Sequence, residues 1–210
     1  MTAFITHYWR KSRLDLAGWL ICALLAMAAS RPVLAESPIE VSPLRLERSS
    51  SALLLSTTLN FELPSAVGDA LLKGVAVFFV AEAEIYRERW YWVDKRVAGV
   101  QRHMRLAFHP LTRRWRLAVS SAVINPNGLG VALSQSFDTL EDALAAVQRI
   151  SSWQIAELVD LAPGATHRLD FRFRLDVSQL PRPLQIGTLG QSDWALSTSL
   201  SQRLEPEGSK

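Results

Sequence analysis

Strict alternation of apolar and charged residues from Leu169 to Val177 is the feature that most constrains how this chain can fold. Odd positions in this stretch hold leucine, phenylalanine or valine, and even positions hold aspartate or arginine. A period of two residues is that of a β-strand, whose side chains point alternately to the two faces of its sheet. The stretch therefore predicts an amphipathic strand with one face in a core and the other in water.

Similar alternation recurs along the chain and predicts further strands. The candidate strands lie around 39–41, 44–46, 53–63, 75–85, 104–108, 115–119, 131–135 and 194–200. The segment 153–161 is ambiguous, although Trp153 and Ile155 favour a strand. The large residues change parity after Ile85, which predicts a bulge or a break at 87–89.

A hairpin is expected around a turn at 109–112, where proline takes its favoured second place in the turn. Pairing His109 with Thr112 would place Arg105 opposite Arg116 on the outer face. Like charges directly opposed destabilise a sheet, so this arrangement would need a compensating partner.

Two short helices are expected between the strands. Pro64 opens the first, and Gly74 stands where a left-handed residue would end it. The second is predicted over 139–151, because Thr139 and Asp142 have the spacing of a capping box and apolar residues follow at helical intervals.

These elements define a mainly β fold class. We expect an antiparallel β-sandwich with two short helices, an immunoglobulin-like arrangement being one form of it. A single β-rich domain is expected over 36–204, with a polar tail at 205–210. Packed side chains are expected to fill the space between its sheets.

The first 35 residues have the composition of an export signal. A basic head at 10–13 precedes an apolar run at 14–29, and small or apolar residues at 33–35 match a signal peptidase site between Ala35 and Glu36. The run is shorter than the roughly 20 residues that span a bilayer, so an uncleaved inner-membrane anchor is the weaker alternative. We expect a periplasmic protein that meets the membrane only transiently, through its signal peptide.

Cleavage changes both the charge and the cysteine content. The signal peptide carries four of the 23 basic residues and one of the 20 acidic residues, which leaves 19 of each. A neutral exported chain lacks the basic surplus of nucleic-acid binders, so no nucleic-acid partner is expected. The single cysteine, Cys22, lies within the apolar run, and the mature chain therefore has neither a disulfide nor a thiolate nucleophile.

No catalytic motif is present in the sequence. It contains no G-x-S-x-G elbow, and the mature histidines His103, His109 and His167 have no zinc-ligand spacing. We expect no enzyme activity, catalytic residue, metal site or cofactor. The alternative, a hydrolase or metal enzyme, would require these histidines to converge with carboxylates in a cleft.

The segment 87–116 carries the features most typical of a binding surface. It holds nine basic residues against two acidic ones and contains three consecutive aromatic residues. Large exposed apolar patches usually mark binding sites, and a basic face can recognise an anionic partner. The alternative is a set of surface ion pairs with Glu82, Glu84 or acids at 138–160. The candidate binding residues are Trp90, Tyr91, Trp92, Arg102, Arg105, Arg114 and Arg116.

Several short motifs occur in order along the chain: Leu63–Pro64, Ala70–Leu71, Gly74–Val75, Arg89–Trp92, Leu111–Trp115, Ser136–Phe137 and Leu180–Gln185. With these motifs the chain resembles an exported proteobacterial family catalogued as domain of unknown function 4390. The similarity extends from about Leu59 to Trp194. The resemblance implies a periplasmic or envelope protein and supplies no known catalytic residues.

The function expected from the sequence is a non-enzymatic domain that recognises another envelope protein through its aromatic and arginine-rich hairpins. A second hypothesis is a small-ligand or lipid-binding sandwich, which would require an apolar cavity between the sheets.

Overall fold

The computed structural model describes residues 39–91, 93–124, 132–182 and 194–204. All of them fall within one compact unit, Ser37–Lys210. The expected signal peptide, its cleavage site, Trp92 and the polar tail lie outside the described residues. Among the residues that are described, no helix is long and apolar enough to cross a membrane.

The described residues form strands throughout, with two α-helices and two short 3-10 turns between them. In chain order the elements are β1 (Ile39–Val41), β2 (Arg45–Arg48), β3 (Ala52–Phe61), α2 (Ser65–Leu72), β4 (Val77–Arg87), β5 (Lys95–His109), β6 (Arg114–Ser120), β7 (Leu133–Phe137), α3 (Leu140–Gln148), β8 (Arg149–Glu157), η1 (Leu158–Asp160), β9 (His167–Leu175), η2 (Val177–Gln179) and β10 (Ser197–Leu204).

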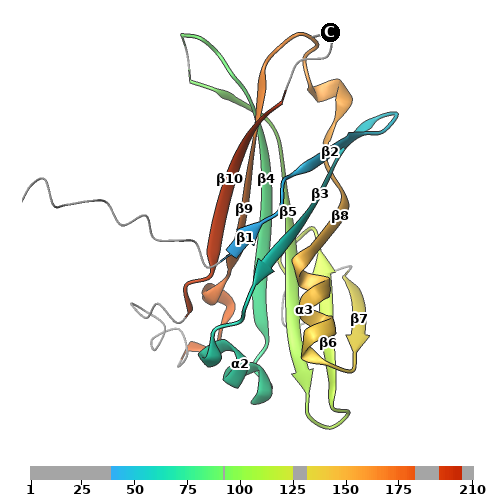
Figure 1. Cartoon of the computed structure of the whole chain (residues 1–210), viewed down its shortest axis with the longest axis vertical. Helices are drawn as coiled ribbons and strands as arrows, with labels where there is room; N and C mark the ends of the chain where they lie inside the picture. Colours follow the sequence, from blue (N-terminus) through green and yellow to red (C-terminus); the bar gives the residue numbers. More distant parts are fainter. Residues whose placement is uncertain (1–38, 92, 125–131, 183–193, 205–210) are drawn as a thin grey trace, which may run out of the picture. The chain divides into compact units, whose positions relative to one another are not determined.

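Within this part of the chain the strands form two antiparallel sheets (Figure 1). In the smaller sheet β3 pairs with β1, β2 and β8, and the larger sheet has the order β10-β9-β4-β5-β6-β7. The expectation of a mainly antiparallel fold in two sheets with two helices is confirmed. The strand order differs from that of an immunoglobulin domain, because β4 to β7 are four consecutive strands of one sheet, whereas immunoglobulin domains place no four consecutive strands in the same sheet.

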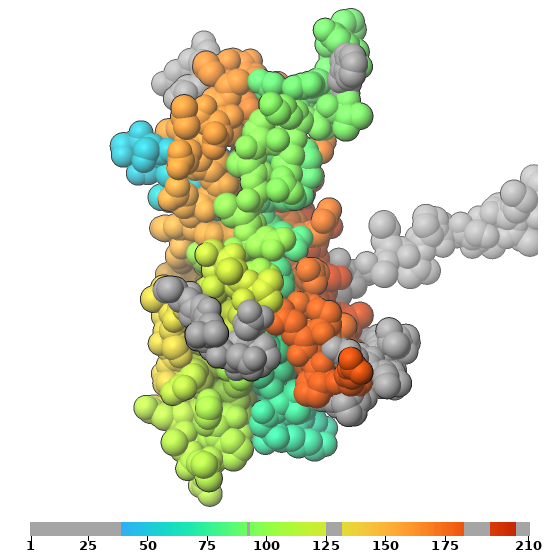
Figure 2. Space-filling model, turned by 180° about the vertical axis from the view of Figure 1, so that it is seen from behind, coloured from blue at the N-terminus to red at the C-terminus, as the bar shows by residue number. Residues whose placement is uncertain are grey.

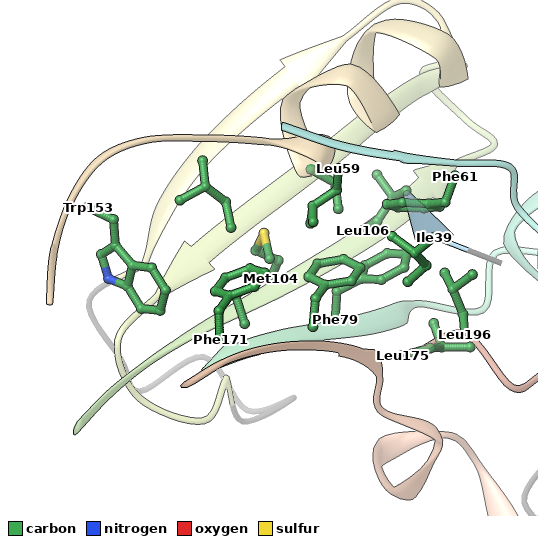
Figure 3. Packing of buried hydrophobic residues seen from close by; sticks show 14 of the residues in the cluster. Ile39, Leu59, Phe61, Phe79, Met104, Leu106, Trp153, Phe171, Leu175 and Leu196 are labelled. Carbon is green, nitrogen blue, oxygen red and sulfur yellow. The ribbon is translucent and has the colours of Figure 1, made fainter. Parts of the chain in front are cut away.

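The core lies between the two sheets and is built from the apolar positions of the alternating strands. Phe61 of β3 packs on Phe173 of β9 and Phe79 of β4, with ring centroids 5.5 and 6.1 Å apart. Figure 3 shows Leu59 and Phe61 on one side of this core, with Phe79 and Phe171 on the other. Buried aromatic rings in contact add stability beyond the area they remove from water.

The irregularity expected at 87–89 lies on the partner strand β5 instead, and β4 keeps its alternation up to Tyr86, which hydrogen-bonds to Glu84 on the same face. Strand β4 continues to Arg87, and the register with β5 shifts between Ile85 and Tyr86, which pair with Ala98 and Arg96. The extra residue, Val97, therefore belongs to the partner strand, a placement that the sequence of β4 alone could not reveal. The strand itself ends at Arg87, where the expected break begins.

The hairpin between β5 and β6 has a longer turn than expected. His109 pairs with Arg114 rather than Thr112, and Arg105 lies opposite Ala118 rather than Arg116. Arg113 takes a left-handed conformation, with φ of 51°, in a turn that is two residues longer. A shift of two residues keeps the same side chains on the buried face, so the apolar pattern could not distinguish the two registers.

Both helices begin where the sequence predicts. Thr139 Oγ1 accepts a hydrogen bond from Asp142 N at 3.1 Å, which confirms the cap of α3. This helix ends at Gln148 rather than at residue 151, because Arg149 already belongs to β8. Gly74 follows α2 with φ of 83°, the left-handed conformation expected there.

Candidate functional site

The tip of the β4–β5 hairpin presents large apolar side chains to solvent. Trp90, Tyr91 and Val93 are 92%, 71% and 88% exposed. The rings of Trp90 and Tyr91 meet edge to face, with centroids 5.0 Å apart. This tip projects from one end of the domain (Figure 2). Two of the three aromatic candidates, Trp90 and Tyr91, are therefore exposed in this turn.

Polar contacts hold the base of this tip. Glu88 N donates a hydrogen bond to the Thr166 carbonyl at 3.0 Å, and Asp94 forms an ion pair with Arg168 at 3.0 Å. Asp94 also accepts a hydrogen bond from the backbone of Arg89 at 3.3 Å. The backbone that carries the aromatic side chains is thus tied to the strand β9 and the loop before it.

Arg102 lies in a different environment from the other arginines. It shares the inward parity of Met104 on β5, and its guanidinium lies 5.0 Å from the ring centroid of Trp153 on β8. Burial lowers the pKa of Arg102. This residue forms part of the contact between the two sheets and is not part of the outer basic surface.

The remaining basic candidates lie toward the β5–β6 turn. Arg114 donates two hydrogen bonds to a single oxygen of Asp138, with Nη2 2.7 Å and Nε 2.9 Å from Oδ1. Arg116 is exposed, and Arg105 is half-buried beside Phe78 and Ala118. Arg105 Nε is a buried nitrogen without a hydrogen bond in the described part of the chain.

The candidate residues therefore do not form one surface. Trp90 and Tyr91 are at the β4–β5 tip, Arg102 is between the sheets, and the other arginines are on the outer face near the opposite hairpin. Several arginines of the larger sheet have the acidic partners expected under the ion-pair alternative. These pairs are Arg96–Glu84, Arg114–Asp138, Arg172–Glu82 and Arg174–Glu82.

The three histidines are also apart from one another. His103 is buried on the outer side of β5, His167 is buried on the inner side of β9, and His109 is exposed at the end of β5. Within the described ranges no three His, Cys, Asp or Glu side chains are grouped as metal ligands would be.

Sequence reasoning missed a pocket at the end of the sandwich nearest the β4–β5 tip. It has a volume of about 570 Å³ and is lined by β2, β3, the η1 segment, β9 and β10. This pocket is open to solvent. The segment 158–165, mostly leucine, alanine, proline and glycine between two strands, is the sequence signal that could have indicated it.

The fold and these surfaces define the class as a two-sheet antiparallel β-sandwich domain with an exposed aromatic turn. The family model described as "Domain of unknown function (DUF4390)" matches residues 36–203, so this chain belongs to that family. No curated protein and no solved structure matches the chain.

Proposed function

We propose that this protein is an exported, non-enzymatic domain that binds another envelope protein through the tip of its β4–β5 hairpin. The observation that carries the proposal is the exposure of Trp90, Tyr91 and Val93, three large apolar side chains in one turn. Tryptophan and tyrosine are enriched at protein interfaces, and they provide most of the energy where they fill a pocket on the partner.

The fixed base of the tip supports this proposal. The contacts of Glu88 with Thr166 and of Asp94 with Arg168 hold the turn in place before any partner arrives. A turn that is already ordered loses less conformational entropy on binding, which favours affinity. Arg89 is exposed beside the aromatic rings, so the complementary surface would be an apolar depression with an acidic rim.

Export and a periplasmic location are part of the same proposal. They rest on the basic head, the apolar run and the cleavage sequence ending at Ala35. The family match begins at Glu36, the residue after the expected cut. Cell fractionation with sequencing of the mature N-terminus tests this part: a chain that begins at Met1 in the membrane fraction would contradict it.

The binding proposal is tested by replacing both Trp90 and Tyr91 with serine. Leu111, in the β5–β6 turn and fully exposed at 101%, provides the matched control Leu111→Ser. Tagged proteins are recovered from envelope extracts, and bound proteins are quantified by mass spectrometry. We expect the recovered amount of one or more envelope proteins to fall at least tenfold with the tip variant. The recovered amount should remain unchanged with Leu111→Ser. Equal recovery by wild type and both variants would overturn the proposal.

A further inference from the structure

The strand β10 forms an open edge of the larger sheet (Figure 1). It pairs with β9 along its whole length without a bulge, and within the described ranges no strand lies on its other side. Edge strands are usually protected against further pairing by proline, lysine, a bulge or short length. The sequence of β10, STSLSQRL, has no proline or lysine, and its eight residues exceed the common strand length of about five or six. This edge is therefore suited to pairing with another strand.

The hydrogen bonds to β9 show which backbone groups of β10 point outward. Leu175 N donates to the Leu196 carbonyl at 2.8 Å, so Leu196 and every second residue after it turn their N–H and C=O groups toward β9. The alternate residues turn these groups toward the open edge. They are all exposed, and no described residue is hydrogen-bonded to their outward backbone groups. These residues are Ser197, Ser199, Ser201 and Arg203.

Leu200 places an apolar side chain on the inner face of this edge. It lies opposite Phe171 of β9, which in turn lies opposite Ala83 of β4. Phe171 and Ala83 are 1% and 0% exposed, whereas Leu200 is 37% exposed. An apolar row of the core thus continues to the edge of the sheet and ends in solvent. A strand with an apolar side chain opposite Leu200 would remove the end of this row from water.

The sequence of β10 matches itself when a second copy lies antiparallel to it. Outward backbone groups can bond only to outward groups, so odd positions must pair with odd positions. Two such registers use nearly the whole strand, one centred on Leu200 and the other on Ser201. The first places Leu200 opposite the same residue of the second copy and Ser199 opposite Ser201, whereas the second places Leu200 opposite Gln202. Matching of apolar residues selects the first register.

We propose that the protein forms a symmetric homodimer in which β10 of each copy pairs antiparallel with β10 of the other, with Leu200 at the two-fold axis. The two larger sheets then form one continuous sheet, and the two Leu200 side chains cover each other, because residues opposed at a non-hydrogen-bonded position approach closely. Arg203 lies opposite Ser197, so no like charges are opposed. The ion pair of Arg203 with Glu88 joins side chains and is compatible with this backbone pairing. The dimer is independent of the proposed binding at the hairpin tip, which uses other residues.

Sedimentation equilibrium of the protein as the cell produces it tests the proposal. We expect a monomer–dimer equilibrium with a dissociation constant in the micromolar range. Leu200→Lys places two cations at the two-fold axis and should weaken the dimer at least tenfold. Leu133→Lys is the matched control, because Leu133 is 75% exposed on β7 at the opposite edge of the same sheet, and it should leave the dimer unchanged. A wild type that stays monomeric, or equal dissociation constants for wild type and Leu200→Lys, would overturn the proposal.

A charge exchange at position 200 distinguishes lost pairing from a folding defect. Leu200→Glu alone should weaken the dimer as Leu200→Lys does, since two like charges again meet at the axis. An equimolar mixture of the two variants should recover the dimer, because a cation then lies opposite an anion. A mixture that dimerises no better than either variant alone would contradict a symmetric contact at Leu200.

Cysteine substitution tests the register. Cys22, the one native cysteine, lies in the expected signal peptide and is replaced with serine in these proteins. Leu200→Cys brings two sulfur atoms together at the proposed axis, whereas Ser201→Cys places them two residues out of step, beyond the reach of a disulfide. We expect a disulfide-linked dimer under mild oxidation with Leu200→Cys and little with Ser201→Cys. Equal yields, or a higher yield with Ser201→Cys, would overturn the assignment.

The tip variant, with serine at positions 90 and 91, keeps the two proposals distinguishable. We expect it to dimerise as the wild type does, because neither residue lies in β10. A tenfold loss of dimer affinity in the tip variant would contradict the location assigned to the interface. Recovery of envelope proteins and dimer formation thus succeed or fail separately.

Discussion

Arg203 of β10 forms an ion pair with Glu88, its Nη2 lying 3.3 Å from Oε2. This contact joins the pocket to the hairpin tip, since Arg203 lines the pocket and Glu88 is the first residue after β4. The backbone of Glu88 is bound on the same side by the Thr166 carbonyl. The pocket and the tip therefore share a border at one end of the sandwich.

The Arg203–Glu88 pair is expected to contribute little to stability. Its arginine is largely exposed, and pairs of this kind are weakened by water and salt. We predict that Arg203→Gln changes the free energy of unfolding by less than about 1 kcal/mol, measured by urea denaturation. A larger loss would mean that the pair belongs to a cooperative network at this end of the domain.

Two buried histidines are expected to make the domain less stable in mild acid. Burial lowers the pKa of His103 and His167, so both stay neutral in the folded chain under conditions where the unfolded chain is protonated. The contribution of the neutral histidines to the free energy of unfolding is complete above the pKa of about 6.5 that they have in the unfolded chain. This contribution is lost as pH falls toward the lower pKa values of the folded chain. The loss per histidine is at most about 1.4 kcal/mol for each pH unit in that window.

Urea unfolding at a series of pH values between 7.5 and 5 checks this expectation. Replacing either buried histidine with glutamine should reduce the slope of stability against pH, because one fewer proton is taken up on unfolding. His109→Gln, at an exposed position of β5, is the control and should leave the slope unchanged. Identical slopes for all three variants and the wild type would contradict the expectation.

Arg102 and Trp153 are expected to act together in stability. We predict that Trp153→Ala costs about 3–5 kcal/mol, because a large buried ring is lost from the contact between the sheets. A double-mutant cycle with Arg102→Ala should give a coupling of about 0.5–2 kcal/mol, the range for a partly desolvated cation over an aromatic ring. A coupling energy of zero would mean that the contact between the guanidinium and the ring contributes nothing to stability.

Residue alternation was sufficient to predict most of the strands and the two-sheet class, although it left β8 ambiguous. It works because a half-buried strand must place every second residue in the core, as β3 and β9 do. It was insufficient for register, since a shift of two residues in the β5–β6 hairpin leaves the same side chains buried. The helical spacing of apolar residues placed the end of α3 three residues too late, because Ile150 fits the apolar face of a helix as well as that of a strand.

The candidate site was predictable only in part for a related reason. Composition identified Trp90 and Tyr91 as aromatic residues in an unusual setting, but it grouped Arg102 and Arg114 with them because they are close in sequence. A long hairpin separates such residues: the β4–β5 tip and the β5–β6 turn are at opposite ends of β5 (Figure 1). The pocket depends on four strands and a loop that are far apart in the chain, and no local pattern reports such an assembly.

Site-specific photo-crosslinking in living cells tests whether the β4–β5 tip binds an envelope protein. A photoreactive amino acid is placed at position 90, and in a matched strain at position 111, the exposed residue of the opposite hairpin. We predict that the photoreactive residue at position 90 crosslinks to a defined envelope protein and that the one at position 111 does not. The same crosslink from both positions, or one from position 111 alone, would contradict the assignment of the β4–β5 tip as the binding surface.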